Sequence, residues 1–443
     1  MSSVEITDPK HIVIISDNEF WKDPRVNRAA LSLSSAFGRI SVISGVTEPV
    51  AKRREQFENI TIYRHRFFKP TYGEARVVKW ATAVALGSSD TNVSLNRESK
   101  ISSLIKTLLR SMFFLGWFLY LLVLNLGIVA RFIRLGGDLY YPNDLDRLLA
   151  GYLLARFHRA RLIYDANELY PDLVEASPGF YRFLLKKLEG FLIRRSDAVI
   201  TVNGSIAEIL QDRYRLERKP TVVLSCPPFQ PVPKRVNASS PPYKVLYQGL
   251  YLPGRNLEGL VLSMRYVENA HLYLRGYGIL EETLRRIVDQ NRLHNKVVFL
   301  APVPMNEMVQ KAAEFDIGIV PYPGDPLNLN SYFCAPNKVF EYMMAGLALA
   351  VSDLPELRKI VDQYDVGITF DPDNAHNIAR ALAELTEESL QRMQVNALAA
   401  ARDTFNFEHE VEKLRRVIQG IGLPIVRLDD CEGPISRSDG ERR

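Results

Sequence analysis

Cysteine and histidine are scarce in this chain of 443 residues, and neither forms a metal-binding pattern. Its three cysteines, Cys226, Cys334 and Cys431, cannot all pair within one chain and lack metal-ligand spacing, as do the seven histidines. This usage indicates a reducing compartment and predicts no metal site. The first ten residues, MSSVEITDPK, lack the charged and then apolar run of a signal peptide. We therefore expect a cytoplasmic protein.

A strong excess of one charge is also missing. The formal net charge of +5 is too weak to predict nucleic-acid binding, but it suits phosphorylated ligands or an anionic membrane surface. No G-x-G-x-x-G motif follows the first apolar run, which argues against a dehydrogenase that binds a dinucleotide. The hydrophobic and charged fractions, 47% and 24%, are ordinary for a globular protein. The length exceeds what one hydrophobic core usually fills, so we expect two domains.

Short apolar runs rich in Val, Ile and Tyr alternate with helical stretches, and this pattern occurs twice along the chain. Strands that are buried on both faces and alternate with helices form parallel, doubly wound sheets. The sequence therefore predicts an α/β fold of two Rossmann-like domains that face each other across a cleft, with ligands beyond the carboxyl ends of the strands. The predicted strands are 11–16, 40–44, 60–65, 138–143, 161–167, 197–203 and 221–226, then 243–249, 270–276, 296–302, 315–322, 347–353 and 366–370.

The boundaries of the two domains follow from composition. Residues 226–243 are rich in Pro and Ser and are predicted to be a linker. The first domain is then 1–225 and the second is 244–404. A C-terminal helix at 405–424 could return to the first domain, and the polar, charged tail 428–443 is predicted to be disordered.

A short helix between Pro336 and Gly346 carries the clearest chemical signal. Proline suits a first helical turn, and glycine suits the residue just past a helix end. Lys338 and Glu341 share a face that the apolar residues of this helix leave free. A helix N-terminus attracts phosphate, Lys338 adds positive charge, and Glu341 can accept hydrogen bonds from two neighbouring hydroxyls. These features match the diphosphate and the ribose of a sugar nucleotide, although an ordinary solvated Lys–Glu pair would give the same pattern.

Residues 111–130 contain no charged side chain, and basic residues flank them on both sides. The segment is long enough to cross a bilayer, yet predicted strands of one sheet precede and follow it. Three interpretations stay open: a buried helix of the first domain, a helix that lies in one leaflet, and a true crossing. The segment 181–195 combines an apolar face with several cations, which favours a nearby membrane but also fits an ordinary domain helix.

A series of short segments occurs in order beside the predicted strands. With these segments the chain resembles the family-4 retaining glycosyltransferases of the GT-B fold over nearly its whole length. The segments are D-P-R-V (23–26), D-L-Y-Y-P-N-D (138–144), Y-D-A-N-E-L (164–169), L-Y-Q-G with a following G-R-N (246–256), L-R-G-Y-G (274–278), P-N-K-V-F-E-Y-M-M-A-G (336–346) and F-N-F-E-H-E (405–410).

The resemblance implies transfer of a sugar from a nucleoside diphosphate sugar to an acceptor hydroxyl. The donor would bind to the second domain and the acceptor mainly to the first, without a metal or another cofactor, because fixed cations and a helix N-terminus can stabilise the departing diphosphate. With residues 111–130, it further suggests a lipid-linked or polysaccharide acceptor, and an enzyme associated peripherally with the cytoplasmic side of a membrane. No nucleic-acid partner is expected.

The resemblance also assigns roles to individual residues. Glu341 matches the glutamate that holds the ribose hydroxyls, and Arg255 with Lys338 would bind the diphosphate. Loop residues before the helix would read the donor sugar, and the loops after 270–276 and 296–302 would border the base. The catalytic candidates are Arg255, Lys338, Glu341 and Asp144, and the donor-binding candidates are Gly249, Arg275, Gly276, Gly278, Val303, Asn330, Ser331, Asn337, Lys338 and Glu341.

Several positions depart from the family pattern. Phe333 stands where a first glutamate is expected, and Leu250 and Asn256 stand where basic residues are expected. No cleft histidine is evident, and Asn143 and Asp144 lie near its place. These departures keep two alternatives open: a non-catalytic subunit that supports a partner transferase, and an isomerase resembling the sugar-nucleotide 2-epimerases.

The acidic residues of the first domain have simpler interpretations too. Asp165 and Glu168 could cap a following helix. The role of Asp23 and Arg25 could be limited to fixing a loop.

Overall fold

The computed structural model describes residues 10–34, 36–46, 53–66, 100–173, 177–232 and 240–424. The tail predicted to be disordered, Cys431 and part of the predicted linker lie outside these residues. The chain divides into two compact units, which are described separately. Unit 1 takes in Met1–Thr201, Leu210–Thr221 and Lys413–Arg443, and unit 2 takes in Val202–Ile209 and Val222–Glu412.

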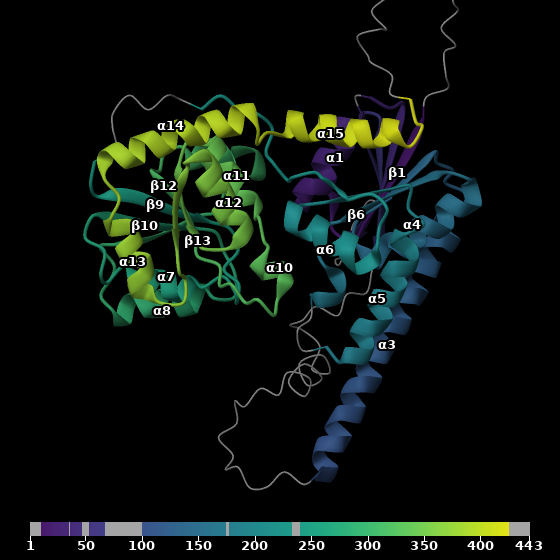
Figure 1. Ribbon diagram of the computed structural model, residues 1–443, viewed down its shortest axis with the longest axis horizontal. Helices are drawn as coiled ribbons and strands as arrows, with labels where there is room; N and C mark the ends of the chain where they lie inside the picture. The colour runs from purple at the N-terminus through teal and green to yellow at the C-terminus, as the bar shows by residue number, and fades with distance from the viewer. Residues whose placement is uncertain are drawn as a thin grey trace, which may run out of the picture. The chain divides into compact units, whose positions relative to one another are not determined.

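Unit 1 is built on an eight-stranded sheet with the order β3-β4-β2-β1-β5-β6-β7-β8. Two of its strands, β1 and β6, are labelled in Figure 1. The strands from β4 to β7 in this order run parallel, whereas β3 pairs with β4 in the antiparallel sense. The central strand β1 is buried along its whole length, as its apolar sequence predicts. The strands are β1 (His11–Ser16), β2 (Arg39–Val46), β3 (Arg54–Phe57), β4 (Ile60–Arg66), β5 (Leu139–Pro142), β6 (Arg161–Ala166), β7 (Ala198–Thr201) and β8 (Thr221–Val222).

Helices connect these strands. The long helix α3 precedes β5 in the chain, and α4 and α5 pack beside it. The described helices in the first half of the chain are α1 (Pro24–Ser34), α3 (Lys100–Phe132), α4 (Leu145–His158), α5 (Gly179–Ile193) and α6 (Gly204–Tyr214).

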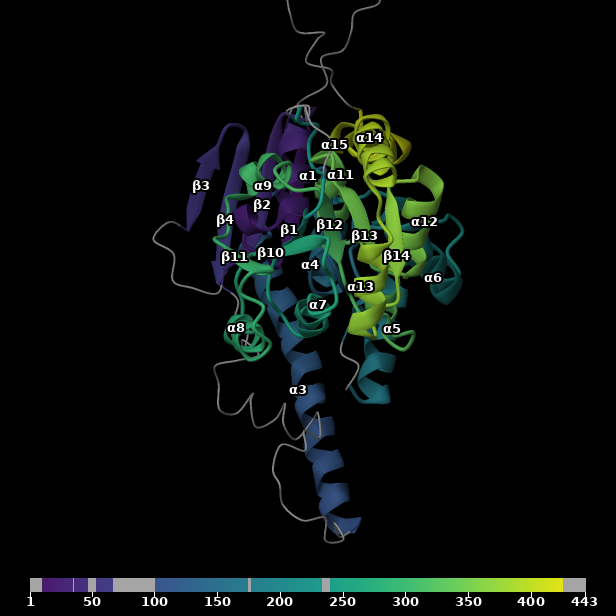
Figure 2. The same ribbon diagram turned by 90° about the vertical axis from the view of Figure 1, so that its left-hand side faces the viewer.

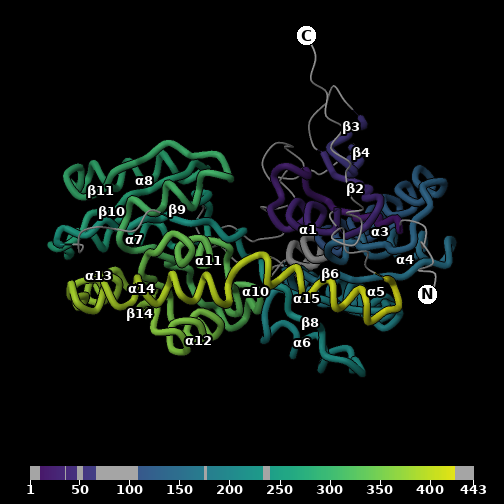
Figure 3. The backbone as a smooth tube through the Cα atoms, turned by 90° about the horizontal axis from the view of Figure 1, so that it is seen from above, coloured from purple at the N-terminus to yellow at the C-terminus, as the bar shows by residue number. Residues whose placement is uncertain are grey.

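Unit 2 contains a six-stranded, fully parallel sheet with the order β11-β10-β9-β12-β13-β14. Figure 3 labels β9, β10 and β11 next to one another at one side of this unit and β14 at the other. Its strands are β9 (Tyr243–Gln248), β10 (Ala270–Arg275), β11 (Val297–Leu300), β12 (Ile317–Val320), β13 (Ala348–Ser352) and β14 (Gly367–Phe370). Its helices are α7 (Leu257–Ser263), α8 (Glu281–Gln290), α9 (Met308–Ala312), α10 (Leu329–Tyr332), α11 (Asn337–Met344), α12 (Pro355–Tyr364), α13 (Ala375–Ala383) and α14 (Glu387–Asp403), and α15 (Phe407–Gly420) extends from unit 2 into residues of unit 1.

Both units share one topology. The parallel strands of each sheet follow the chain order 3-2-1-4-5-6 of the doubly wound fold, which confirms the predicted fold class. The strand order reverses between β1 and β5 in unit 1 and between β9 and β12 in unit 2. Ligands of open α/β sheets bind beyond the carboxyl ends of the strands at such a reversal. These two places are therefore where functional side chains are expected.

Helix α3 runs out beyond the sheet of unit 1, with α5 beside it (Figures 1 and 2). Among the described residues it is the one helix whose length and composition would allow it to cross a membrane, over Leu108–Phe132 with a mean hydropathy of 2.2. Only 22% of this segment is buried inside the protein. The interpretation of residues 111–130 as a buried helix of the first domain is therefore wrong.

Candidate functional site

Two cations meet at the carboxyl edge of the unit 2 sheet, where the strand order reverses. Arg255 lies in the loop after β9, and Lys338 lies in the first turn of α11. Both flank the ring of Tyr322, which follows β12: the Arg255 guanidinium carbon is 4.3 Å and the Lys338 Nζ 5.0 Å from the ring centroid. The Lys338 Nζ is also 4.0 Å from the ring centroid of Tyr247, at the end of β9.

Lys338 and Glu341 are both buried, with exposed fractions of 9% and 6%. The interpretation as a solvated Lys–Glu pair is therefore wrong. Burial lowers the pKa of the Lys338 ammonium, but interactions with Tyr322 and Tyr247 outweigh it and place the pKa above its usual value. Lys338 is thus a fixed, charged cation at neutral pH.

Gly249 makes room for this cation. A Cβ atom at this position would lie 3.0 Å from the Lys338 Nζ, and the backbone φ of +143° is one that side chains rarely adopt. The helix that carries Lys338 begins one residue later than predicted, because Pro336 has extended backbone angles and precedes the first turn. It ends as predicted, with Gly346 at a φ of +75° just beyond it.

The next loop along the sheet, after β10, packs tightly on the loop after β9. A Cβ atom on Gly276 would lie 1.9 Å from the Gly249 carbonyl oxygen, and one on Gly278 would lie 2.4 Å from the Tyr251 carbonyl oxygen. The close approach of two backbones therefore explains both glycines. Their predicted contact with a base stays a prediction, as does that of Val303, which is half-buried after β11.

Arg275 is buried at the end of β10 and turns towards its own sheet. Its Nη1 donates a hydrogen bond to the Gln248 Oε1 at 3.1 Å, and its guanidinium carbon lies 5.0 Å from the ring centroid of Phe315. Burial lowers the pKa of this guanidinium. The structure thus brings Arg255 and Lys338 together at Tyr322 and gives Arg275 a different set of partners.

The residues before α11 form one short, capped turn. The Asn328 side chain accepts a hydrogen bond from the Ser331 backbone N–H at 3.1 Å, which starts α10 and positions Asn330. Phe333, at the place of the expected first glutamate, packs edge-on against Tyr332 with the ring centroids 4.9 Å apart. Asn337 follows as the first residue of α11 and is half-buried.

Asn256, which stands where a lysine is expected, has a structural role in this loop. Its side-chain amide donates to the Pro372 carbonyl oxygen at 2.7 Å, and its backbone is left-handed. Within the described residues of this loop, Arg255 is therefore the basic side chain that reaches Tyr322.

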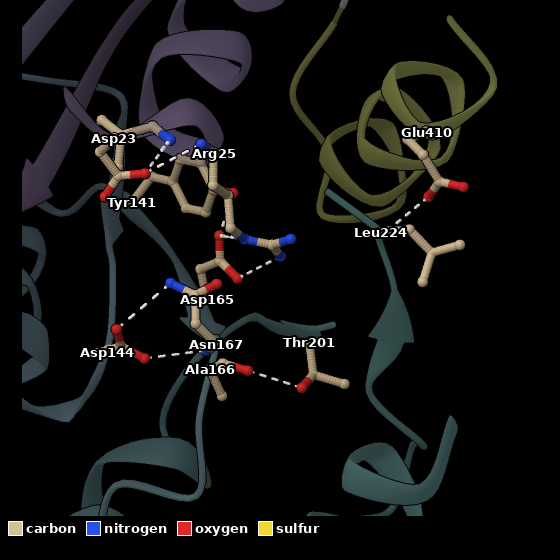
Figure 4. A network of polar contacts seen from close by, with 11 residues as sticks. Asp23, Arg25, Tyr141, Asp144, Asp165, Ala166, Asn167, Thr201, Leu224 and Glu410 are labelled. Carbon is tan, nitrogen blue, oxygen red and sulfur yellow. Dashed lines mark hydrogen bonds and ion pairs between the residues drawn. The ribbon is translucent and has the colours of Figure 1, made fainter. Parts of the chain in front are cut away.

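In unit 1, Arg25 and Tyr141 converge on the fully buried carboxylate of Asp165 (Figure 4). The Arg25 Nη2 and Nε donate to its two oxygens at 2.6 and 2.9 Å, and the Tyr141 hydroxyl donates at 2.7 Å. Burial and the Asp165 charge raise the pKa of Tyr141 well above its usual value, so the tyrosine stays a neutral donor. Asp165 lies inside β6, so its interpretation as a helix cap is wrong.

The segment Asp23 to Val26 combines a cap with this ion pair. The Asp23 carboxylate accepts from the backbone N–H groups of Arg25 and Val26 at 3.0 and 3.1 Å, as a residue that caps α1 does. Pro24 opens the helix, and Val26 is buried. This local geometry directs the Arg25 side chain to Asp165 (Figure 4).

Asp144 lies at the same edge, between β5 and α4, with a positive φ of 56°. Its carboxylate accepts from the backbone N–H of Asn167 at 3.0 Å and faces the Asn167 amide at 3.4 Å (Figure 4). Burial, followed by the nearby charges of Glu168, Asp146 and Asp165, raises the pKa of Asp144 well above its usual value. A carboxyl group with a raised pKa holds its proton more tightly than an ordinary one, and its ionised form is a stronger base.

Solved structures share this fold at low sequence identity. Sucrose-phosphate synthase from Thermosynechococcus elongatus is 16% identical, with a TM-score of 0.66 and coverage of 93% of this chain and 98% of its own. HepE of Anabaena, solved in complex with UDP, is 13% identical, with a TM-score of 0.60 and coverage of 93% and 99%. A glycosyltransferase from Rickettsia africae is 12% identical, with a TM-score of 0.58 and coverage of 94% and 100%. No curated protein sequence matches the chain.

Family models match a part of each unit. Residues 244–388 match the family described as Glycosyl transferases group 1, and residues 100–227 match the family described as Glycosyltransferase Family 4. The chain is a family-4-like glycosyltransferase of the GT-B fold. The group 1 match includes both Lys338 and Glu341.

Two features of this glycosyltransferase were not predicted from the sequence. The rings of Tyr247 and Tyr322 surround Lys338, and a buried ion pair joins Asp17, after β1, to Arg147 in α4. Tyr322 directly follows a strand at the reversal of the sheet, so the rule for ligand sites in open sheets could have pointed to it. Nothing local in the sequence marks Arg147 as the partner of Asp17.

Proposed function

We propose that this glycosyltransferase transfers a sugar from a UDP-sugar to a hydroxyl of a glycan, either lipid-linked or part of a polysaccharide. The observation that carries the donor half is the pair of cations, Arg255 and Lys338, that both lie against the ring of Tyr322 at the strand reversal of unit 2. UDP as the nucleotide is supported by the similar fold of HepE, which was solved with UDP and with UDP-glucose.

The two cations and the N-terminus of α11 bind the diphosphate in this proposal. Negative charge grows on the diphosphate as the bond to the sugar breaks, and preorganised positive groups stabilise it more in the transition state than in the ground state. Lys338 is suited to this task because burial fixes its ammonium in place before substrate arrives. Such a site needs no metal ion for charge neutralisation.

The remaining donor contacts follow the order of the loops along the sheet. Glu341 accepts hydrogen bonds from the ribose hydroxyls, and Asn330 and Ser331 contact the sugar. Gly249, whose own N–H donates to the Arg275 carbonyl oxygen, has no side chain between its loop and the diphosphate, and Asn337 places its backbone N–H near that group. Arg275, Gly276, Gly278 and Val303 border the base.

The reaction proceeds with retention of the anomeric configuration, as the family resemblance suggests. Asp144 is the candidate in unit 1 for receiving the proton of the acceptor hydroxyl, because it lies at the carboxyl edge of the sheet and its raised pKa makes its ionised form a stronger base. The enzyme works in the cytoplasm and associates peripherally with a membrane, which would bring it to a lipid-linked acceptor.

Calorimetric titration with UDP, GDP and TDP in the presence of EDTA tests the donor site. We expect selective binding of UDP, and a loss of about 10- to 150-fold for Glu341→Ala if the carboxylate holds the ribose. Lys338→Met should lose at least as much, whereas Lys311→Met, which removes an exposed lysine paired with Glu314, should bind normally. Equal binding by wild type and Lys338→Met would contradict the assignment.

Product analysis tests the reaction itself. Sugar transfer to an added glycan acceptor supports the proposal. UDP binding without turnover would favour the non-catalytic subunit, and conversion of the donor without an acceptor would favour the isomerase.

A further inference from the structure

We propose that α3 and α5 form a docking surface for one leaflet of an anionic bilayer, with α3 lying in that leaflet and not crossing it. This inference rests on the membrane association in the proposed function and specifies the surface and the mode of contact. The docking surface is defined by exposed side chains of two helices and of one residue just beyond the second helix. They are Leu108, Leu109, Met112, Leu115, Leu119, Val123 and Leu126 of α3, Phe180, Phe183, Lys187 and Phe191 of α5, and Arg195, which follows α5.

One face of α3 is apolar and exposed over much of its length. Its members recur three or four residues apart from Leu108 to Leu126, so they share one side of the helix. Val123 and Met112 are 65% and 62% exposed. No charged side chain interrupts residues 111–130. Leaving such a face in water is costly, at roughly 25 cal/mol for each Å² of apolar surface.

The opposite face of α3 belongs to the core of unit 1. Phe114, Leu121, Ile128 and Phe132 are buried, as is the polar Asn125. The Asn125 amide donates to the Asp146 carbonyl oxygen of α4 at 2.8 Å and accepts from the Ala150 N–H at 2.9 Å. This side of the helix therefore cannot face lipid while unit 1 is folded.

That attachment excludes a simple crossing. The strands before and after α3, β4 and β5, belong to the same sheet, and α3 packs on α4 beside them. The hydrocarbon core of a bilayer is about 30 Å thick, so a crossing would carry the attached α4 into lipid. A helix in the interface instead buries its apolar face about 5–10 Å deep and leaves its other face with the protein.

Helix α5 supplies the charge that selects anionic lipid. Phe180, Phe183, Lys187, Phe191 and Arg195 are spaced three or four residues apart along one exposed stripe. The Lys187 Nζ lies 5.3 Å from the ring centroid of Phe183, and the Arg195 guanidinium carbon lies 3.6 Å from that of Phe191. Rings that enter the acyl region beside cations that meet phosphate are typical of membrane-surface helices.

The two helices lie side by side in unit 1 (Figures 1 and 2). The ring centroids of Phe114 in α3 and Tyr181 in α5 are 5.0 Å apart, so the start of α5 packs against the part of α3 around Phe114. Phe180 and Phe183 flank Tyr181 in the sequence and thus belong to the same region. This proximity joins an apolar surface to a basic, aromatic one.

A bilayer fits this surface better than a second copy of the chain does. Protein interfaces have a polar rim around their apolar centre, and the exposed face of α3 has none over residues 111–130. A second copy would also bring the like-charged stripes of α5 near each other if the contact were symmetric.

Vesicle sedimentation with the full-length protein tests the surface. We expect binding to vesicles of phosphatidylcholine and phosphatidylglycerol, and weaker binding to phosphatidylcholine alone. Val123→Glu should weaken binding at least about tenfold, because it places a charge at the acyl boundary. The matched control is Val395→Glu on α14, which changes a valine of similar exposure, 61%, and should bind as wild type does.

A separate pair of variants tests the contribution of the basic side chains Lys187 and Arg195 to vesicle binding. Lys187→Glu with Arg195→Glu should abolish the preference for anionic vesicles, whereas Arg286→Glu on α8, an exposed arginine of unit 2, should not. UDP titration of each variant keeps the test separate from the donor site. Normal UDP binding with lost vesicle binding supports the docking surface, and lost UDP binding with normal vesicle binding contradicts only the proposed function.

Fluorescence quenching of Trp117 by brominated lipids distinguishes the leaflet from a crossing. With the other two tryptophans replaced by phenylalanine, we expect the strongest quenching from bromine near the headgroup end of the acyl chain. Strongest quenching from bromine at the bilayer centre would overturn the leaflet placement. Equal vesicle binding by Val123→Glu and wild type, or a dimer in solution that Val123→Glu dissociates, would overturn the docking surface.

Discussion

Arg25 and Asp165, which are 140 residues apart in the sequence, form a two-point ion pair inside unit 1, with nitrogen–oxygen distances of 2.6 and 2.9 Å. The pair joins the first turn of α1 to β6 across the strand reversal. Since the Asp165 carboxylate is fully buried, it depends on Arg25 and on the Tyr141 hydroxyl for its stability. Pairing with the buried Asp165 therefore explains the presence of Arg25 in its short motif, whatever role the motif has in binding.

Loss of Arg25 should destabilise the protein strongly. Arg25→Ala leaves a buried charge without its partner, and we expect a fall of about 3–5 kcal/mol in the free energy of unfolding. Tyr141→Phe removes one hydrogen bond to the same carboxylate and should cost about 1.5–3 kcal/mol. Urea unfolding followed by tryptophan fluorescence measures both. The control is Arg161→Ala, which breaks the exposed pair with Asp197 and should change the value by less than about 1 kcal/mol.

The raised pKa of Asp144 predicts a pH-dependent effect of Asp144→Asn. The folded state holds the proton more tightly than the unfolded state, so ionisation above the unfolded pKa of about 4 favours unfolding. Asparagine has no such ionisation and tolerates a positive φ. We expect the melting temperature of Asp144→Asn, relative to wild type, to rise as the pH increases from about 4 towards neutrality. A constant difference over this range would show that Asp144 ionises normally.

Enzyme kinetics provide a second, separate test of the role of Asp144. If it receives the acceptor proton, Asp144→Asn should lower kcat about 100-fold or more while leaving UDP affinity unchanged. Unchanged kcat would leave Asp144 with a structural role only.

Most of the fold could be predicted from the sequence because a buried parallel strand is a short run of apolar residues, which is recognisable in the sequence. The runs at 11–16 and 243–249, for example, are β1 and β9 almost to the residue. Strand β3 was missed because its sequence, R-E-Q-F, is polar and it lies antiparallel at the edge of the sheet. An edge strand with one exposed side needs no apolar run.

The site was less predictable because its charges are set by distant contacts. The boundaries of α11 follow from Pro336 and Gly346, which are local signals. The burial of Lys338 depends on Tyr247 and Tyr322, which come from the ends of two different strands. Asp165 was likewise open to a capping interpretation until its partner Arg25 was known.

Gly276→Ala should damage the donor side of unit 2. The added methyl group would overlap the Gly249 carbonyl oxygen, so the loop that faces Lys338 must move. We expect a loss of about 1–3 kcal/mol of stability, measured by thermal melting, and weaker UDP binding. Gly116→Ala is the matched control: nothing lies within 4 Å of the new methyl group in α3, and alanine should stabilise the helix by up to about 1 kcal/mol. Equal effects of the two variants would contradict the packing argument.

Asn125 provides a final prediction, because it ties the exposed helix α3 to the start of α4, directly after Asp144. Its side chain makes hydrogen bonds to the Leu121 and Asp146 carbonyl oxygens, both at 2.8 Å, and to the Ala150 N–H at 2.9 Å. Asn125→Ala breaks all of these in a buried place, so we expect a cost of about 2–4 kcal/mol. Asn396→Ala, which removes two bonds to Asp365 at an exposed site, should cost less than about 1 kcal/mol.

The kinetic effect of Asn125→Ala should be confined to the acceptor half of the reaction. The start of α4 carries the backbone of Asp144, so a looser α3 should lower kcat while UDP affinity, which the proposed donor site assigns to unit 2, stays as in wild type. Vesicle binding should persist, since the exposed face of α3 is unchanged. A parallel fall in UDP affinity would indicate general unfolding, and an unchanged kcat at full stability loss would show that Asn125 holds the fold without positioning Asp144.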